Sequence, residues 1–193
     1  MPEPRVNVPS RPAELEQAGR YRPAVSERER TYSWGDPMQT ATAARTMAGV
    51  DLLRAAMSGD LPGPPIAASL GFDLVEVTEG RVVFAFEPAE YHYNPIGSVH
   101  GGVYATLLDS AAGCAVHSML PAGVGYTSLD LTVKFLRAIT LDTGRVTCVG
   151  TVTHLGGRTA LAEARLLDGA DRLLGTAVSS ILVIRPQPGT QVG

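Results

Sequence analysis

One acidic residue lies inside a long apolar stretch of the sequence. Asp109 is the only group that is ionised at neutral pH between Val103 and Met119. A buried carboxylate must be paired, receive hydrogen bonds or take up a proton, and such groups occur often at functional sites. We therefore expect Asp109 to act as a general base or a nucleophile. The alternative is a structural carboxylate that bonds a neighbouring strand.

A second set of candidates comes just before this stretch, between Asn94 and Gly102. His100, Gly101 and Gly102 stand where a helix would begin, and glycines leave the first backbone N–H groups unobstructed. Together with the helix dipole, such groups stabilise developing negative charge, as an oxyanion hole does. Three alternatives remain open: a plain tight turn, a capping role for His100, and a turn-forming role for Asn94.

The spacing of the two sets constrains how they could act together. Asp109 follows Gly101 by eight residues, which is about 12 Å along a helix. Both groups would have to lie about 3 Å from the reacting atoms. They must then come from different subunits whose helices pack side by side and antiparallel. The spacing predicts a homodimer with two shared active sites.

One helix and a surrounding sheet must position these residues. Residues 103–120 have the composition of a helix, and their apolar positions go nearly all the way round, so this helix should be buried. Alternating patterns predict strands over residues 72–77, 81–87, 125–137, 144–153, 159–167 and 172–185. The expected fold is α+β, with an antiparallel sheet of about six strands wrapped around one central helix.

Composition excludes several classes of protein. The chain of 193 residues is long enough for one domain, and its net charge of −3 opposes a nucleic-acid binder. No stretch reaches the roughly 18 apolar residues of a membrane span. The charged fraction of 18% is low for a monomer, which favours a surface buried against a partner. We expect a cytoplasmic protein in which Cys114 and Cys148 are reduced core residues.

The passage NPIGSVHGGVYATLLDSAAG resembles the signature of the hot-dog-fold acyl-CoA thioesterases of the phenylacetic-acid-degradation (PaaI-type) branch. The resemblance covers roughly residues 62–185, including the later segment TSLDLTVKFLRAI. It implies a hot-dog homodimer, which often pairs again into a homotetramer. It also implies hydrolysis of a coenzyme A thioester to the free acid and coenzyme A, without a metal or redox cofactor.

The same resemblance implies roles for individual residues. Asp109 would be the base or nucleophile, and the Gly101 N–H would polarise the thioester carbonyl. Asn94 and His100 would shape that end of the site. Ser128 matches the serine that helps to hold the attacking water, with a solvent-facing strand hydroxyl as the alternative.

Further residues are candidates for binding the substrate. Arg137 and Arg158 could meet the phosphates of coenzyme A, with solvated arginines as the alternative, and Lys134 is a weaker candidate. The acyl pocket should be lined by apolar residues around the helix, including the region from Phe72 to Phe84. The substrate-binding candidates are Gly102, Tyr104, Leu108, Arg137, Gly157 and Arg158.

The motifs of other hydrolases are missing from the sequence. No GxSxG elbow and no GxxxxGK loop is present, which opposes serine-hydrolase and nucleotide-hydrolase functions. His92, His117 and His154 lack a partner at metal-ligand spacing, so we expect no metal site. Two alternatives to a thioesterase remain: a noncatalytic hot-dog module that binds acyl-CoA, and a hot-dog dehydratase or hydratase of acyl thioesters.

Four segments follow from these patterns. Residues 1–45 hold seven of the 16 basic and six of the 19 acidic residues, with scattered prolines, which predicts a flexible polar arm. Residues 46–61 should form a short leading helix that ends near Gly59, with an irregular link after it. The hot-dog thioesterase domain should span residues 62–185, and a flexible tail residues 186–193.

Overall fold

The computed structural model describes residues 28–186. The chain divides into two compact units between Thr31 and Tyr32, and the fold below is that of the second unit. Residues 1–27 of the predicted arm and 187–193 of the predicted tail lie outside the described residues.

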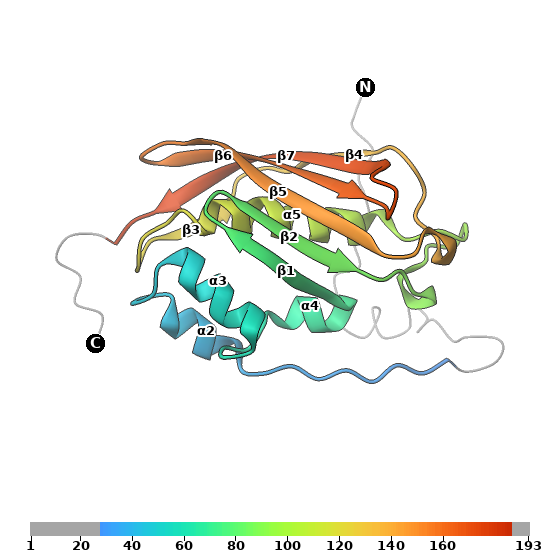
Figure 1. Cartoon of the computed structure of the whole chain (residues 1–193), viewed down its shortest axis with the longest axis horizontal. Helices are drawn as coiled ribbons and strands as arrows, with labels where there is room; N and C mark the ends of the chain where they lie inside the picture. The colour runs from blue at the N-terminus through green and yellow to red at the C-terminus, as the bar shows by residue number, and fades with distance from the viewer. Residues whose placement is uncertain (1–27, 187–193) are drawn as a thin grey trace, which may run out of the picture. The chain divides into compact units, whose positions relative to one another are not determined.

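An antiparallel sheet forms most of this unit (Figure 1). Its strands are β1 (Phe72–Thr78), β2 (Arg81–Phe86), β3 (Gly125–Ser128), β4 (Thr132–Phe135), β5 (Val146–Leu155), β6 (Thr159–Leu167) and β7 (Leu173–Ile184). The order is β1-β2-β5-β6-β7-β3, and β4 also pairs with β7. Short 3-10 turns lie at Glu90–His92 and Leu141–Thr143.

The sheet has seven strands where the sequence predicts about six, because the strand expected over residues 125–137 is interrupted. Asp130 lies in the interruption between β3 and β4. Its carboxylate accepts the Ser180 N–H at 3.0 Å, and its carbonyl accepts the Ser179 hydroxyl at 2.7 Å. These bonds to β7 replace the regular ladder, so one continuous alternating pattern becomes two short strands.

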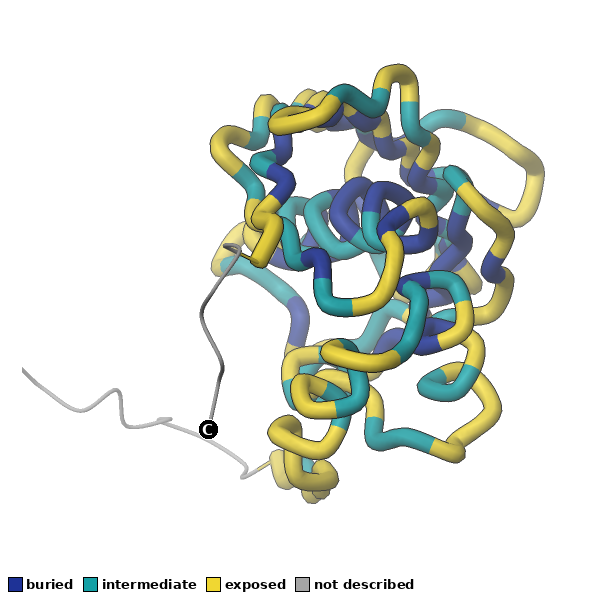
Figure 2. The backbone as a smooth tube through the Cα atoms, turned by 90° about the vertical axis from the view of Figure 1, so that its left-hand side faces the viewer, coloured by how far each residue is buried: buried dark blue, intermediate teal, exposed yellow. Residues whose placement is uncertain are grey.

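The helix α5 (Gly101–His117) lies inside the curl of this sheet, as expected. It packs against β2, β5, β6 and β7, and Figure 2 shows its buried turns at the centre of the described fold. At Gly150 of β5 the two backbones touch directly, because a Cβ there would come within 2.0 Å of the Ala111 carbonyl oxygen. The predicted α+β arrangement of a sheet wrapped around one helix is confirmed.

Three shorter helices precede the sheet, namely α2 (Pro37–Ala43), α3 (Gly49–Ser58) and α4 (Pro65–Leu70). The predicted leading helix is α3, and it ends at Gly59 with a left-handed φ of 87°. The sequence predicts neither α2, inside the expected arm, nor α4, inside the expected irregular link. Both begin with proline in the first turn, and the Asp36 side chain caps α2 by accepting the Met38 N–H.

These three helices form one layer against the core. The layer packs through α3 on β1 and on the end of α5, through α4 on β1, and through α2 on α3 (Figure 1). The Gly49 N–H donates to the Leu120 carbonyl at 2.9 Å, and a Cβ at Gly49 would lie 1.8 Å from the His117 carbonyl oxygen. The start of α3 is therefore fixed against the end of α5.

The state of the cysteines and the membrane-span expectation can both be compared with the described residues. Cys148 is buried and Cys114 half-buried, and both thiols are free. No helix within residues 28–186 is long and apolar enough to cross a membrane.

Candidate active site

The structure brings Asp109 and Ser128 together. The Ser128 hydroxyl donates to a carboxylate oxygen of Asp109 at 2.7 Å, and both side chains are half-buried. Ser128 therefore faces the helix rather than solvent alone. A carboxylate held by a strand hydroxyl is the geometry expected for a positioned base, and also for the structural alternative.

Local geometry explains why this pair lies beside an aromatic ring. On β3, Tyr126 and Ser128 are two residues apart and project to the same face. On α5, Asp109, Gly113 and His117 are four residues apart and share one stripe. The Tyr126 ring lies on Gly113, where a Cβ would come within 2.8 Å of it, and its centroid is 5.0 Å from that of His117. The stripe thus continues from Asp109 along the helix under Tyr126.

Beyond Asp109, three titratable groups lie on or beside this stripe, namely Cys114, His117 and Tyr126. Burial raises the pKa of the Cys114 thiol to about 11, against a hydrogen bond from Tyr126 that lowers it. Burial also raises the pKa of Tyr126 well above its usual value and lowers the pKa of His117. Beyond Asp109, the surroundings favour neutral groups.

At the other end of α5, His100 is the N-cap residue. Its Nδ1 accepts the Gly102 N–H at 2.9 Å, so the capping alternative is the geometry found. The Gly102 N–H is thereby occupied. Within residues 28–186 no acceptor lies in hydrogen-bonding position to the Gly101 N–H. Gly101 is thus the residue whose N–H is left for a bound group.

Asn94 organises the turn that leads into this helix. Its side-chain oxygen accepts the N–H groups of Ile96 and Ser98 at 3.0 and 3.2 Å, and its amide donates to the Ser98 hydroxyl at 3.2 Å. This is the turn-forming alternative. Asn94 positions the start of the site through backbone bonds.

Four of the predicted site residues line one hollow of about 350 Å³ at the start of α5: Asn94, Gly101, Tyr104 and Arg137. The buried Tyr104 hydroxyl donates to the Arg137 carbonyl at 2.9 Å and accepts the Ile139 N–H at 2.7 Å. Tyr104 therefore fixes the chain after β4. Leu108 is fully buried in the core and does not line this hollow.

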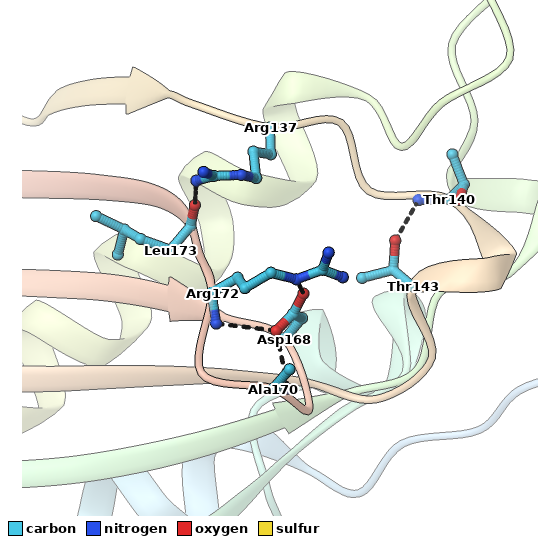
Figure 3. Close-up of polar contacts among 7 residues, drawn as sticks. All are labelled: Arg137, Thr140, Thr143, Asp168, Ala170, Arg172 and Leu173. Carbon is cyan, nitrogen blue, oxygen red and sulfur yellow. Dashed lines mark hydrogen bonds and ion pairs between the residues drawn. The ribbon is translucent and has the colours of Figure 1, made fainter.

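The two candidate arginines lie at opposite ends of β7. Figure 3 shows the Arg137 guanidinium donating to the Leu173 carbonyl, at 2.6 Å, beside the turn in which Arg172 bonds Asp168. The Arg158 carbonyl instead accepts the Val183 N–H. Ten residues of strand separate Leu173 from Val183, or about 33 Å. One chain does not bring the two arginines together.

The turn that holds Arg158 also contains Gly157, which is exposed. The carbonyl of Gly157 accepts the Arg185 guanidinium at 3.2 Å. Tyr126 pairs with Val183 on the neighbouring strand. This turn therefore lies at the end of the fold where α5 finishes, away from Gly101.

His92 is used for packing in the described fold. His92 is buried, accepts the Ala89 N–H at 2.9 Å and contacts the Leu70 carbonyl at 2.7 Å. Among residues 28–186, no group of three or more His, Cys, Asp or Glu side chains is arranged to hold a metal ion.

Sequence reasoning missed Tyr126, Cys114 and His117 as neighbours of the site. These three line a second, larger cavity. Counting back two residues from Ser128 finds Tyr126, and counting forward eight from Asp109 finds His117. These spacings can be read from the sequence, but they indicate neighbouring side chains only once β3 is known to lie along α5.

Comparison with known proteins gives the family of this chain. The family model of the thioesterase superfamily matches residues 96–174, which include Gly101, Asp109 and Ser128. A Halobacterium salinarum protein named only as a candidate esterase is 38% identical over 107 residues, or 53% of this chain and 69% of that protein. The chain belongs to the thioesterase superfamily. This membership confirms the predicted family and the predicted hydrolase class.

The chain is also similar to a further sequence relative and to a solved structure. The 1,4-dihydroxy-2-naphthoyl-CoA hydrolase of Listeria monocytogenes is 28% identical over 116 residues, covering 60% of this chain and 92% of its own. The structure of the E. coli PaaI protein from the phenylacetic acid degradation operon superposes with a TM-score of 0.62 at 23% identity. That likeness covers 70% of this chain and 94% of the PaaI chain. The predicted hot-dog fold is confirmed.

Proposed function

We propose that this superfamily member is an acyl-CoA thioesterase that hydrolyses a coenzyme A thioester to the free acid and coenzyme A. One observation carries the proposal: α5 begins with the unoccupied Gly101 N–H and bears, eight residues later, an Asp109 held by Ser128. An oxyanion donor and a positioned base are the two groups that acyl transfer to water needs. The name of the Listeria relative supports coenzyme A as the leaving group.

In the proposed reaction, the Gly101 N–H of one subunit donates a hydrogen bond to the thioester oxygen and stabilises the negative charge that develops there. Asp109 of the other subunit takes a proton from a water molecule held near Ser128, and the resulting hydroxide attacks the carbonyl carbon. The C–S bond then breaks, and the coenzyme A thiolate leaves and takes up a proton. In the alternative route Asp109 attacks the carbon itself, the C–S bond breaks and the coenzyme A thiolate leaves, and water then hydrolyses the mixed anhydride to the free acid. Both routes require the Asp109 carboxylate.

The shared site requires a homodimer, and the free edge of the sheet supports one. Within the described residues β3 pairs only with β7, which leaves its other side open. Leu129, Phe135 and Leu136 near this edge are exposed to 57%, 58% and 51%. A second copy placed there with antiparallel helices would cover these side chains and continue the sheet. A further pairing into a homotetramer remains part of the proposal.

The antiparallel arrangement of the two helices would also bring Arg137 of one subunit close to Arg158 of the other. Arg137 lies at the Gly101 end of its own subunit, and Arg158 lies at the far end of α5. In the dimer, Arg158 of one subunit therefore approaches Arg137 of the other. We propose that this pair of cations binds the phosphates of coenzyme A.

The proposed reaction uses water as its only co-reactant and calls on no metal or redox cofactor. The free thiols of Cys114 and Cys148 support the proposed cytoplasmic location, where thiols stay reduced.

Release of free thiol from a panel of acyl-CoA substrates tests the proposed function. We expect the purified protein to release coenzyme A from at least one of acetyl-, octanoyl-, palmitoyl- and phenylacetyl-CoA, read with a colorimetric thiol reagent. Crotonyl-CoA is added to the panel to test the hydratase alternative: loss of its enoyl absorbance without release of thiol would identify a hydratase. Binding of every thioester without turnover would identify a noncatalytic acyl-CoA module.

Subunit mixing tests the shared site. A chain with Asp109→Asn and a chain with Gly101→Pro should each be nearly inactive as homodimers. After the two are unfolded together and refolded, half of the dimers are mixed and hold one intact site, so about a quarter of the wild-type activity should return. Activity no higher than the sum of the separate variants, in a sample with verified mixed dimers, would contradict a site shared between subunits.

A further inference from the structure

A cavity of about 570 Å³ lies between the three N-terminal helices and the core. Leu52, Leu53, Ala56 and Met57 of α3 line one side, and Phe72 and Phe84 of β1 and β2 line the opposite side. Pockets that hold small molecules typically have volumes of roughly 300–1,000 Å³. The cavity is therefore of the size that holds a ligand group.

This cavity continues the stripe that begins at Asp109. Cys114, His117 and Tyr126 line its inner end. Tyr126 lies two residues before Ser128 on the same face of β3, and its ring covers Gly113, one helical turn after Asp109. Four residues of helix correspond to about 6 Å. A group attached to a carbonyl carbon at Asp109 would thus reach the cavity within a few bonds.

The chemistry of the walls favours an uncharged, apolar group. Most lining residues are aliphatic, aromatic or proline, and the Thr40 hydroxyl is already bound to the Pro62 carbonyl at 2.7 Å. Burial raises the pKa of both the Tyr126 hydroxyl and the Cys114 thiol, which keeps these two polar groups neutral. Among the lining residues, all of them described, only Asp73 is an acid or a permanent cation, and it is exposed. A charged group placed inside would be desolvated without a partner.

We propose that the acyl group of the thioester binds in this cavity, so that the helices α2, α3 and α4 select a bulky apolar acyl group. This inference rests on the proposed function and adds the class of substrate. The three helices precede residues 96–174, the part matched by the superfamily model. Selection of the acyl group is therefore made by a segment of this chain that lies outside the matched region. A two-carbon acyl group would leave the cavity largely unfilled and would gain little binding free energy from it.

A cavity-filling substitution tests the proposal with a matched control one residue away. Ala56 lines the cavity and Ala55 does not, although both are half-buried residues of α3. Each is replaced by phenylalanine in the Asp109→Asn background, so that thioesters bind without turnover, and Kd is measured calorimetrically for octanoyl-CoA and acetyl-CoA. Ala56→Phe should raise the ratio of the octanoyl-CoA Kd to the acetyl-CoA Kd at least about 10-fold. Ala55→Phe should leave this ratio within about 2-fold of its parent.

The outcomes separate this inference from the proposed function. If the wild-type protein releases thiol but Ala56→Phe leaves the Kd ratio unchanged, the cavity does not hold the acyl group and thioester hydrolysis still stands. If the wild-type protein hydrolyses no thioester but the ratio rises as expected, the cavity is an acyl-binding site in a noncatalytic module. An equal rise in both variants, with both folded by circular dichroism, would indicate a general disturbance of α3 and overturn the inference.

Discussion

Replacing Asp109 by asparagine is expected to lower kcat for the preferred acyl-CoA by about 10²–10⁴-fold, the usual contribution of a general base. Asparagine has nearly the same shape as aspartate, and its side-chain oxygen can still accept the Ser128 hydroxyl that now lies 2.7 Å from the carboxylate. An amide can neither take up the proton of water nor attack the thioester as a carboxylate does. The measurement is the steady-state rate of thiol release at saturating substrate.

Asp142→Asn is the matched control for this substitution. Asp142 is an exposed acid in the 3-10 turn at Leu141–Thr143, and it lines neither the hollow at the start of α5 nor the cavity beneath the N-terminal helices. It should retain wild-type turnover, and both variants should keep the wild-type circular dichroism and oligomeric state. A folded Asp109→Asn protein with turnover within about 3-fold of wild type would remove Asp109 from the mechanism and leave it the structural carboxylate of the alternative.

The central helix and the sheet could be predicted because their patterns depend on local sequence alone. Residues 103–120 are apolar on nearly every side, and a helix inside a curled sheet is the arrangement that buries such a segment. The strand alternation places Ser128 on the face opposite Leu129, but it does not predict that Ser128 faces α5, because the apolar face of a strand usually packs on the core. In the structure Leu129 is exposed and Ser128 is bonded to Asp109 of the helix.

The remaining differences come from contacts that local patterns do not contain. Asp130 ends β3 because β7 supplies two donors to it, and β7 lies about 50 residues further along the chain. The helices α2 and α4 are seven and six residues long, too short to be stable alone, so they depend on caps and on packing. The cavity beside Tyr126 is lined by residues of α2, α3, α4, β1, β2, α5 and β3, so it forms only when all these elements meet. Composition cannot reveal such a meeting.

Replacing Gly101 by proline is expected to lower kcat by about 10²–10³-fold, the usual cost of losing one oxyanion donor. Gly101 is the first residue of α5, a position where proline is tolerated because its N–H has no partner within the helix. His100 before it has φ −62° and ψ 138°, the extended conformation that a residue preceding proline adopts. The bond from the Gly102 N–H to His100 can stay in place. The substitution therefore removes one N–H and lets the start of the helix keep its geometry, while the added side chain meets the Phe135 ring.

Gly101→Ala separates the loss of that N–H from the effect of added bulk. A Cβ at this position meets the Phe135 ring at 3.2 Å, in alanine as in proline, but alanine keeps the N–H. Alanine should retain kcat within about 5-fold of wild type, while proline should lose it at unchanged helix content. Equal losses in the two variants would assign the effect to crowding against Phe135 and reject the donor role. His100 caps the helix through the Gly102 N–H and leaves the Gly101 N–H without a partner among the described residues. A loss confined to proline would mean that this single backbone N–H stabilises the negative charge of the transition state.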